Sequence, residues 1–514
     1  MYFFMPGDWY GLFLIQPITV FMYTPYFKRF AIVFCFLLLS AISFAQPSPA
    51  LEEDLPKDYL TKEFHFGRRD ALRAAMPDNS VAVIFSYPVR NFSNDVDYFY
   101  HQNPDLYYLS GYKEPNSMLL VFKDDQADSA GNKFNEVLFV QKRNALAEQW
   151  TGRRLGTEGA KGKLGFNLAL NGEQFDSFPV DFSKFDKILF DRLPEEVADN
   201  RRDKADLYDL VEQFKKKAGI GEDYAKDKRF DSRGYYEITA SLREIKTPEE
   251  MSLIRKAVEI SCQGQNEVMK VVRPDMSELE IQGLHEYVHK KYGAEGVGYG
   301  SIIGAGENGC VLHYMENTKT KIGNNLLLMD VGAEYHGYTA DVTRTIPAKG
   351  KFSAEEKQIY QLVYDAQEAA FKTLKNGSKW KDAEDAARNV ISEGLIKLGI
   401  IKEKSESRKY YPHGLGHHIG LDVHDRGNYG TMKKDMVMTI EPGIYIPEGS
   451  NCDKKWWSIA VRIEDDALIT ETGYELLSAF APRSIEDIEK MISQKSSLDD
   501  FKLPPLKSGQ KKGF

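Results

Sequence analysis

The chain has 514 residues, of which 42% are hydrophobic and 28% are charged. This length allows two or three domains with large cores, and the composition is that of an ordinary globular protein. Its 76 acidic and 67 basic residues give a formal net charge of −9. The acidic excess argues against a general nucleic-acid binder, so we expect no nucleic-acid partner. The four cysteines form no CxxC pair and no dense framework, which argues against a structural zinc site and a disulfide scaffold.

The N-terminus has the pattern of a targeting segment. The basic pair Lys28-Arg29 precedes the apolar run Phe30–Leu39, and the small residues Ser43 and Ala45 follow it. These are the features of a secretory signal peptide cleaved after Ala45. We therefore expect residues 1–45 to be removed and the mature protein to be exported, periplasmic or secreted, without a stable membrane span. The apolar run is short for a membrane span, so an uncleaved N-terminal anchor is the minor alternative.

The segment that follows predicts an α/β domain over residues 61–235, after a proline- and acid-rich linker over residues 46–60. Strand-like apolar runs alternate there with helix-compatible segments, an order that favours a mixed α/β architecture. The runs expected to form strands are Ser80–Ser86, Ser117–Phe122, Glu136–Val140 and Lys187–Phe190, and the expected helices are Thr61–Met76 and Leu207–Lys216.

The second half, residues 245–485, predicts an α+β domain. Three of its helices are expected to begin at capping sequences, which are Thr247-x-x-Glu250, Ser277-x-x-Glu280 and Ser353-x-x-Glu356. A fourth helix is expected over Lys381–Leu398, and strands over Tyr299–Ile303, Leu326–Pro347, Met436–Ile440 and Ile459–Ile469. The lysine-rich tail, residues 495–514, lacks apolar periodicity and is expected to be disordered.

The stretch from residue 326 to residue 347 predicts a β-hairpin that carries two aspartates. A two-residue turn at His336-Gly337 would pair Asp330 with Thr343 and make Asp330 and Asp341 diagonal neighbours on one face, at a separation of roughly 7–8 Å. A shift of one residue would send them to opposite faces. Two carboxylates in an apolar strand pair cost free energy unless a cation compensates them, so the hairpin predicts a metal site. His336, at the tip, is expected to be exposed.

Further candidate ligands follow downstream. Six of the ten histidines fall between His313 and His424, and several of them are crowded among glycines, where backbone can approach a ligand closely. Glu441 stands at a strand end before Pro-Gly. In the last predicted strand, alternation puts Arg462 and Glu464 on one face.

Each of these residues alone has an ordinary structural interpretation, and the neighbouring Asp465 and Asp466 are expected to be solvated charges. The joint pattern of four carboxylates and clustered histidines favours a metal centre. Oxygen-rich ligation with an imidazole suits Mn²⁺, Co²⁺ or Zn²⁺. Four negative charges are more than one ion needs, and a pair of ions about 3.5–4 Å apart would balance them and activate water.

Several motifs resemble the aminopeptidase P branch of the pita-bread metallopeptidases. The motifs are GAGENGCVLHYMEN around His313, MDVGAEYHGYTADVTRT, HGLGHHIGLDVHD, TIEPGIYI and VRIEDD, and the resemblance extends over about residues 60–485. It implies a pita-bread (creatinase/aminopeptidase) catalytic domain of α+β class over residues 245–485, preceded by an α/β N-terminal domain. The implied activity is that of a metalloaminopeptidase that releases an N-terminal residue preceding proline.

The resemblance also implies roles for individual residues. It implies two divalent ions, with Mn²⁺ favoured over Co²⁺ and Zn²⁺, held by Asp330, Asp341, His417, Glu441 and Glu464. It implies substrate-positioning and transition-state roles for His313, His413 and His424, with Arg462 and Tyr445 nearby. In the implied mechanism a metal-bridging hydroxide attacks the X-Pro carbonyl, Glu441 accepts the proton of the water, and His424 hydrogen-bonds the oxyanion.

The sequence leaves alternatives open. A prolidase, which cleaves X-Pro dipeptides, is the main one, whereas the long N-terminal domain disfavours a methionine aminopeptidase. A metal-free relative acting as an amidinohydrolase or a scaffold usually lacks metal ligands, and none is missing here. The resemblance also implies a homo-oligomer, either a dimer or a tetramer. Trp456 and Trp457 stand where the family usually has a glycine-rich stretch, and they either reshape the substrate mouth or pack.

Overall fold

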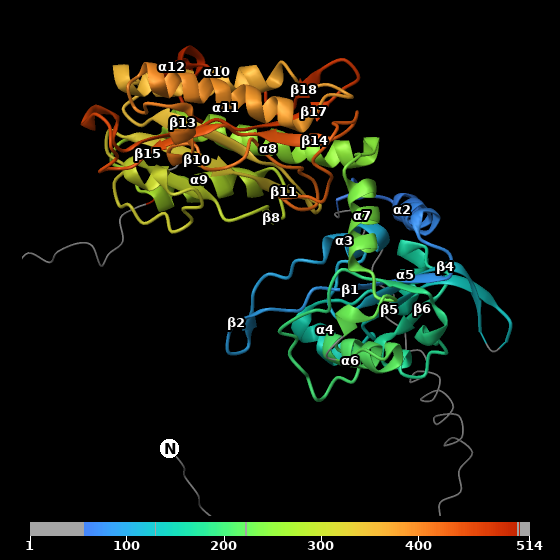
Figure 1. Cartoon of the computed structure of the whole chain (residues 1–514). Helices are drawn as coiled ribbons and strands as arrows, with labels where there is room; N and C mark the ends of the chain where they lie inside the picture. The colour runs from blue at the N-terminus through green and yellow to red at the C-terminus, as the bar shows by residue number, and fades with distance from the viewer. Residues whose placement is uncertain (1–55, 129, 222–223, 501–502, 504–514) are drawn as a thin grey trace, which may run out of the picture. The chain divides into compact units, whose positions relative to one another are not determined.

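The computed structural model describes residues 56–128, 130–221, 224–500 and 503 (Figure 1). The expected signal peptide, most of the linker and most of the expected disordered tail lie outside the described residues. At the start of that tail, Ser496 and Ser497 donate hydrogen bonds to the carboxylate of Glu267, at 2.9 and 2.8 Å. Within the described ranges, none of the helices is both long enough and apolar enough to cross a membrane.

A five-stranded sheet forms the centre of the N-terminal domain. Its strand order is β6-β5-β4-β1-β7, formed by β1 (Ser80–Phe85), β4 (Met118–Ala127), β5 (Lys133–Val140), β6 (Ala169–Asn171) and β7 (Lys187–Leu189). A short hairpin, β2 (Asn91–Ser93) and β3 (Val96–Asp97), lies outside this sheet. The helices are α2 (Lys62–Ala75), α3 (Pro104–Ser110), α4 (Ala145–Thr151), α5 (Gly156–Leu164), α6 (Leu207–Ala218) and α7 (Ser232–Arg243).

Strand β1 is buried on both faces, which explains its continuous apolar sequence. Val81 and Val83 join a phenylalanine-rich core cluster with residues of α6, whereas Ala82 and Ile84 join a cluster that includes residues of α2 and α3. The alternation follows from the period of two along a strand. The second of these clusters continues into the catalytic domain, so one hydrophobic core is shared between the two domains.

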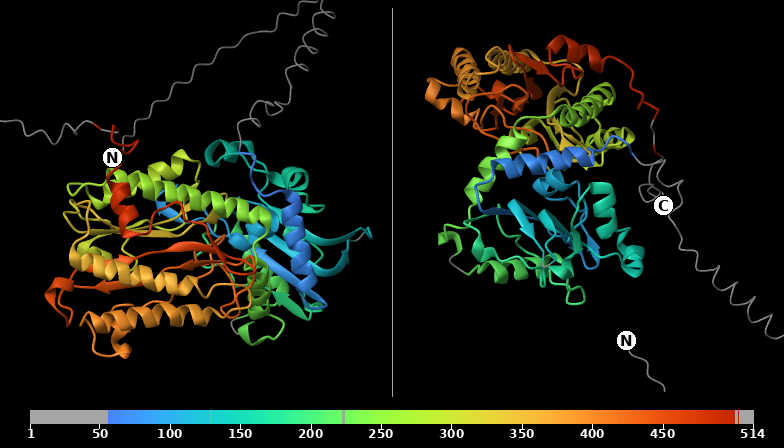
Figure 2. Two further views of the ribbon diagram at one scale, coloured as in Figure 1. Left: turned by 90° about the horizontal axis from the view of Figure 1, so that it is seen from above. Right: turned by 90° about the vertical axis from the view of Figure 1, so that its right-hand side faces the viewer.

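The catalytic domain consists of two similar halves, each with two long helices packed on antiparallel strands. The first half contains α8 (Pro248–Val271), α9 (Glu278–Lys291), β8 (Gly296–Val297), β9 (Ile302–Ala305), β10 (Leu326–Val331), β11 (Ala333–Tyr335), β12 (Tyr338–Thr339) and β13 (Val342–Pro347). The second contains α10 (Ala354–Phe371), α11 (Trp380–Lys397), β14 (Val437–Ile440), β15 (Gly443–Ile446), β16 (Ile459–Arg462), β17 (Asp465–Ile469), β18 (Tyr474–Leu476) and α12 (Ile485–Ile492). The strands lie between the helix pairs α8/α9 and α10/α11 (Figures 1 and 2).

The three predicted helix starts are confirmed. Thr247 and Ser353 each form a complete capping box with the glutamate three residues later, and Ser277 accepts a hydrogen bond from the backbone N–H of Glu280. A capping box satisfies amide groups that the first helical turn leaves without partners. These starts depend on four neighbouring residues, which is why the sequence alone locates them.

The predicted hairpin register is also confirmed. His336 and Gly337 have φ angles of 51° and 88°, the two positive values of a type I′ turn. Asp330 pairs with Thr343. His336, however, is 2% exposed, so the expectation of an exposed tip is wrong. Its carbonyl accepts a hydrogen bond from the hydroxyl of Tyr107 on α3, at 3.0 Å, because the N-terminal domain covers the tip.

The last predicted strand is divided in two. Strand β16 pairs with β15, whereas β17 pairs with β14 and β18 in a separate sheet. Asp465 and Asp466 open β17 and are fully buried, so the expectation of solvated charges is wrong. Asp465 forms an ion pair with Arg344 at 2.7 Å, and Asp466 accepts a hydrogen bond from the backbone N–H of Asp341 at 3.1 Å. Both aspartates find these partners on or next to β13, far away in the sequence.

The two tryptophans before β16 pack into the fold. Trp456 is 3% exposed and belongs to the largest core cluster, and Trp457 packs against the same cluster. The indole N–H of Trp457 donates to the carbonyl of Ser450 at 2.9 Å. The packing interpretation therefore holds for both residues.

Candidate metal centre

A pocket of about 470 Å³ in the catalytic domain brings the predicted site residues together. The two aspartates reach it from the hairpin, Glu441 from the end of β14, and Glu464 from the break between β16 and β17. Its walls include Asp330, Asp341, Glu441, Glu464, His313, His413, His417, His424, Arg462 and Tyr299. Tyr445 does not line the pocket, but its hydroxyl contacts both His413 and Arg462, each at 2.9 Å.

Asp341, His417 and Glu464 form the closest group of possible metal ligands. One donor atom of each lies within 4.8 Å of the other two, and all three residues are buried. His417 Nε2 lies 3.5 Å from the Asp341 carboxylate and 3.6 Å from that of Glu441. The remaining carboxylate, Asp330, accepts a hydrogen bond from Arg462 at 2.5 Å. The five candidate ligands therefore face a common space from four segments, which are the hairpin, the loop with His417, the end of β14 and the break between β16 and β17.

Tyr299 is a site residue that was not among the predicted ones. Its hydroxyl lies 2.5 Å from a carboxylate oxygen of Asp330 and 2.6 Å from one of Asp341, so a single O–H bridges the two hairpin acids. Burial is the main cause that raises the pKa of Tyr299 well above its usual value, and the charges of both aspartates add to it. In the sequence Tyr299 opens the strand expected over Tyr299–Ile303, and nothing local in that run marks its contact with the hairpin acids.

A buried glutamine on α8 holds the hairpin strands. The side-chain amide of Gln265 donates to the carbonyl of Met329 at 3.0 Å and to that of Val342 at 2.8 Å. Met329 precedes Asp330 and Val342 follows Asp341, so one side chain ties together the backbone next to both acids. Gln265 is fully buried on the core-facing side of α8.

A second buried glutamine makes the equivalent contacts in the other half. The side-chain amide of Gln367, on α10, donates to the carbonyls of Ile440 at 2.8 Å and Ile463 at 3.1 Å. These two residues directly precede Glu441 and Glu464. The two halves of the domain therefore use the same device, a glutamine from the covering helix, to fix the strand ends that carry the acids.

The acids of the pocket lie close together and have perturbed pKa values, and a cation would compensate their charge. Burial is the main cause that raises the pKa of Glu441 to about 8, and burial together with the charges of Asp341 and Glu441 raises the pKa of Glu464 well above its usual range. Burial opposes ionisation of Asp341 too, but a hydrogen bond from His417 holds its pKa below the usual value. Burial would lower the pKa of His417, but the same contact with Asp341 raises it to about 9.

The ligand set fits divalent metal ions. Without a cation, several of these carboxylates must hold protons, because burial and mutual repulsion disfavour four adjacent negative charges. Carboxylate oxygens with one imidazole are ligands that Mn²⁺, Co²⁺ and Zn²⁺ accept. Asp330, Asp341, His417, Glu441 and Glu464 would hold the ions.

Two of the other histidines on the pocket wall, His413 and His424, have lowered pKa values. Burial is the main cause that lowers the pKa of His413 to about 4, and the charge of Arg462 adds to it. His413 Nδ1 contacts the carbonyl of Gly414 at 2.9 Å and therefore carries the proton, which leaves Nε2 to accept from the hydroxyl of Tyr445. Tyr445 in turn accepts from Arg462, so a continuous hydrogen-bond chain orients the imidazole.

His424 lies next to the candidate ligand His417, with ring centroids 4.2 Å apart. Burial is the main cause that lowers the pKa of His424, and the positive charge of His417 adds to it. His313 lies on the wall between Leu312 and Met315. The pocket thus combines a cation site with imidazoles that can donate or accept hydrogen bonds beside it.

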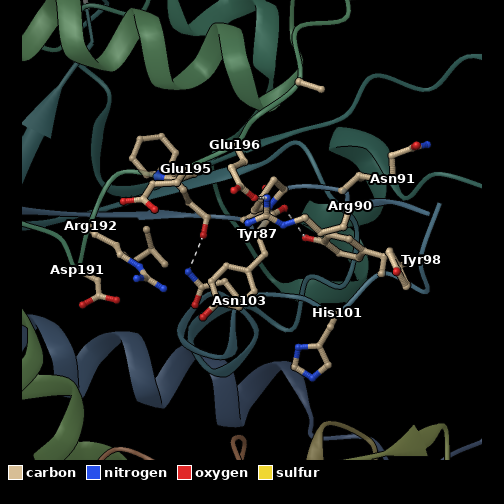
Figure 3. A pocket seen from close by; sticks show the side chains of 18 of the residues that line it. Tyr87, Arg90, Asn91, Tyr98, His101, Asn103, Asp191, Arg192, Glu195 and Glu196 are labelled. Carbon is tan, nitrogen blue, oxygen red and sulfur yellow. Dashed lines mark hydrogen bonds and ion pairs between the residues drawn. The ribbon is translucent and has the colours of Figure 1, made fainter. Parts of the chain in front are cut away.

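A second pocket, of about 800 Å³, lies in the N-terminal domain near the β2–β3 hairpin (Figure 3). Its polar groups are largely paired with one another or with the backbone: Arg90 contacts Glu196 at 2.5 Å, and the side-chain amide of Asn103 donates to the carbonyl of Phe85 at 2.8 Å. None of the predicted site residues lines it. Across the described residues, the group that could hold a metal lies in the smaller pocket, where we therefore place the chemistry.

Both domains match known families. Residues 252–471 match the model of metallopeptidase family M24, and residues 65–187 match that of the aminopeptidase P N-terminal domain. The chain is 35% identical to the Xaa-Pro aminopeptidase of Haemophilus influenzae, over 84% of this chain and 98% of that protein. It is 30% identical to the mitochondrial intermediate cleaving peptidase 55 of Arabidopsis thaliana, over 91% of this chain and 92% of that protein.

A solved structure agrees with these matches. A variant of Escherichia coli aminopeptidase P in complex with substrate superposes with a TM-score of 0.74 at 32% identity, covering 84% of this chain and 98% of that chain. The expected fold, a pita-bread catalytic domain behind an aminopeptidase P N-terminal domain, is confirmed. The chain belongs to the aminopeptidase P family of M24 metallopeptidases and is a hydrolase of that family.

Proposed function

We propose that this metallopeptidase is an Xaa-Pro aminopeptidase, which releases the N-terminal residue from peptides with proline in the second position. The observation that carries the proposal is the convergence of four carboxylates, three of them buried, and His417 with His313, His413 and His424 in one pocket. The similarity to Xaa-Pro aminopeptidases over nearly the full length of those proteins supports it.

The chain's own residues supply most of the proposed mechanism. Divalent ions held by the five candidate ligands would activate water and polarise the scissile carbonyl. Glu441, on the pocket wall, accepts the proton of the attacking water and returns it to the leaving nitrogen of proline. His424 donates a hydrogen bond to the oxygen on which negative charge develops. His313 and His413 form the wall of the proline subsite and exclude water from it.

Peptide panels test the specificity. Metal-loaded protein is offered an X-Pro dipeptide, an X-Pro-Y tripeptide and an X-Ala-Y tripeptide. We expect release of X from X-Pro-Y. Cleavage of the dipeptide alone would instead establish a prolidase. Cleavage of X-Ala-Y at the same rate would exclude proline specificity, and no cleavage of any peptide would exclude the peptidase.

We propose two divalent ions per chain, with Mn²⁺ as the native metal and Co²⁺ and Zn²⁺ as substitutes. The oxygen-rich ligand set with one imidazole supports this choice. Metal analysis of purified protein, followed by activity with each metal restored in turn to stripped protein, tests it. Two equivalents of metal and highest activity with Mn²⁺ are expected. No bound metal in an active enzyme would overturn the proposal.

We also propose that the protein acts after export and as a homo-oligomer, a dimer or tetramer. The basic, apolar and small-residue pattern before Gln46 supports export. A mature N-terminus at Gln46 in the extracytoplasmic fraction is expected, whereas a retained leader in the membrane fraction would favour the anchor. Light scattering of the purified protein measures the assembly, and a monomer would refute it.

A further inference from the structure

Two buried cations, Arg243 and Lys246, contact the loop that carries His424, residues 419–426. Asp425, 6% exposed, accepts hydrogen bonds from the guanidinium of Arg243 and from the ammonium of Lys246, the latter at 2.8 Å. Arg243 also donates to Asp422, at 2.8 Å. Asp422 and Asp425 lie on either side of His424, so the anchors bracket the imidazole in the sequence.

The same arginine, the last residue of α7, also contacts α3 of the N-terminal domain. Arg243 donates to Asp105 on α3 at 2.7 Å, and the other oxygen of that carboxylate accepts from the hydroxyl of Tyr235 at 2.9 Å. Next in the loop, Arg426 donates to Asp191 at 2.9 Å. Asp191 lies on the wall of the larger pocket, where Figure 3 shows it. Two charged residues of the N-terminal domain, Arg243 and Asp191, therefore contact the loop directly.

The contribution of these ion pairs to folding stability does not explain why so many charged groups are buried together. Arg243, Lys246, Asp105 and Asp425 are all nearly fully buried, and two cations face two anions. Burying such ion pairs costs desolvation free energy that their attraction only about repays, and well-packed apolar residues often stabilise a fold as well. What the charges do provide is direction, because a planar guanidinium holds carboxylates at fixed angles on its two edges.

We propose that Arg243 and Lys246 are positioning residues, which fix the His424 loop through Asp422 and Asp425, and that Asp105 on α3 is part of this clamp because it orients Arg243. The inference rests on the proposed role of His424 in hydrolysis. The ring of His424 lies 4.2 Å from that of His417, so movement of the loop displaces it from the reacting bond. A misplacement of about 1 Å can cost about 100-fold in rate.

Three substitutions test the clamp. Asp425→Asn keeps the shape of the side chain and removes its charge. Arg243→Lys keeps the positive charge but removes the planar guanidinium that contacts several carboxylates at once. It serves as the second variant if Asp425→Asn does not fold. Asp105→Asn weakens the ion pairs of α3 with Arg243 and Arg426, at 2.7 and 3.5 Å, and leaves Asp422 and Asp425 unchanged.

Glu136→Gln is the matched control. Glu136 is 5% exposed and its carboxylate accepts from two cations, Arg69 and Arg73, each at 2.9 Å. Like Asp425→Asn, it turns a buried carboxylate between two cations into an amide, but on β5, away from the loop. A purely stabilising role would make the two variants behave alike.

Two readouts decide the outcome. In metal-loaded protein of measured metal content, we expect each clamp variant to lower kcat for an X-Pro-Y peptide about 10- to 100-fold with KM unchanged, as for removal of a supporting hydrogen bond at a metal site. We expect hydrogen–deuterium exchange of the peptide covering residues 415–428 to become faster. Glu136→Gln should lose thermal stability with kcat and this exchange unchanged.

Wild-type kcat and wild-type loop exchange in a folded clamp variant would overturn the inference, as would equal effects in Glu136→Gln. If the wild-type protein cleaves no X-Pro-Y peptide, the proposed function fails, and the exchange of the loop still decides the clamp. The two failures are therefore distinguishable.

Discussion

Replacement of Gln265 by leucine would remove two hydrogen bonds from the strands that carry Asp330 and Asp341. The amide of Gln265 donates to the carbonyls of Met329 and Val342 at 3.0 and 2.8 Å, in a fully buried position where leucine can form neither hydrogen bond. Each lost buried hydrogen bond contributes about 0.5–1.5 kcal/mol, so the free energy of unfolding should fall by about 1–3 kcal/mol.

The same change should weaken metal binding. Met329 and Val342 adjoin the two hairpin ligands, and we expect the affinity for Mn²⁺ to fall about 10- to 100-fold because the carboxylates lose their fixed orientation. Urea unfolding of metal-free protein measures the stability, and titration calorimetry measures the affinity.

The control is Gln263→Leu, two residues away on the same helix. The amide of Gln263 donates to Glu267 at 3.3 Å in a half-buried position, so this substitution should change stability by no more than about 0.5 kcal/mol. Equal stability and equal metal affinity in the two variants would refute the reasoning that Gln265 holds the hairpin.

Three further predictions concern acid stability, the core and the metal. Burial lowers the pKa of His289 from 6.5 to about 4. The pKa of His289 in the folded state lies below its unfolded value, so the fold disfavours the protonated imidazole. The contribution of His289 to the free energy of unfolding is therefore complete above pH 6.5 and decreases by about 3 kcal/mol as the pH falls towards 4. His289→Leu should reduce the pH dependence of the unfolding free energy of metal-free protein by this amount over that range, and an unchanged slope would contradict the assignment. Trp456→Ala should lower the unfolding free energy by about 3–5 kcal/mol in a denaturant titration without changing kcat of the folded protein, because Trp456 lies in the core; a loss below 1 kcal/mol (about the size of a surface change) would contradict this packing. Asp341→Ala should abolish metal binding in calorimetry and X-Pro cleavage with the fold retained by circular dichroism, and normal cleavage would remove Asp341 from the metal site.

Local features of the fold were predictable from the sequence. The helix starts at Thr247, Ser277 and Ser353 each depend on a side chain and an amide within one turn. The turn at His336-Gly337 depends on a two-residue loop and on the alternation of its arms. In both cases the residues that make the interaction are near neighbours in the chain, so the pattern of the sequence contains the whole interaction.

The candidate metal ligands were also predictable from the sequence, for a different reason. A carboxylate in an apolar strand is costly without a partner, so Asp330, Asp341 and Glu464 are conspicuous among the residues around them. Their presence in one pocket agrees with that expectation. The sequence by itself thus predicted which side chains would hold a cation, and it determined that two of them lie on the same face of the hairpin.

Only the tertiary structure decided what surrounds those side chains. His336 is covered by Tyr107, more than two hundred residues earlier, and Asp465 is neutralised by Arg344 on another strand. Gln265 and Arg243 look like an ordinary helix residue and an ordinary surface cation in the sequence. A polar group acquires its role from the partner that burial places against it, and that partner is set by the packing of distant segments, which no local pattern encodes.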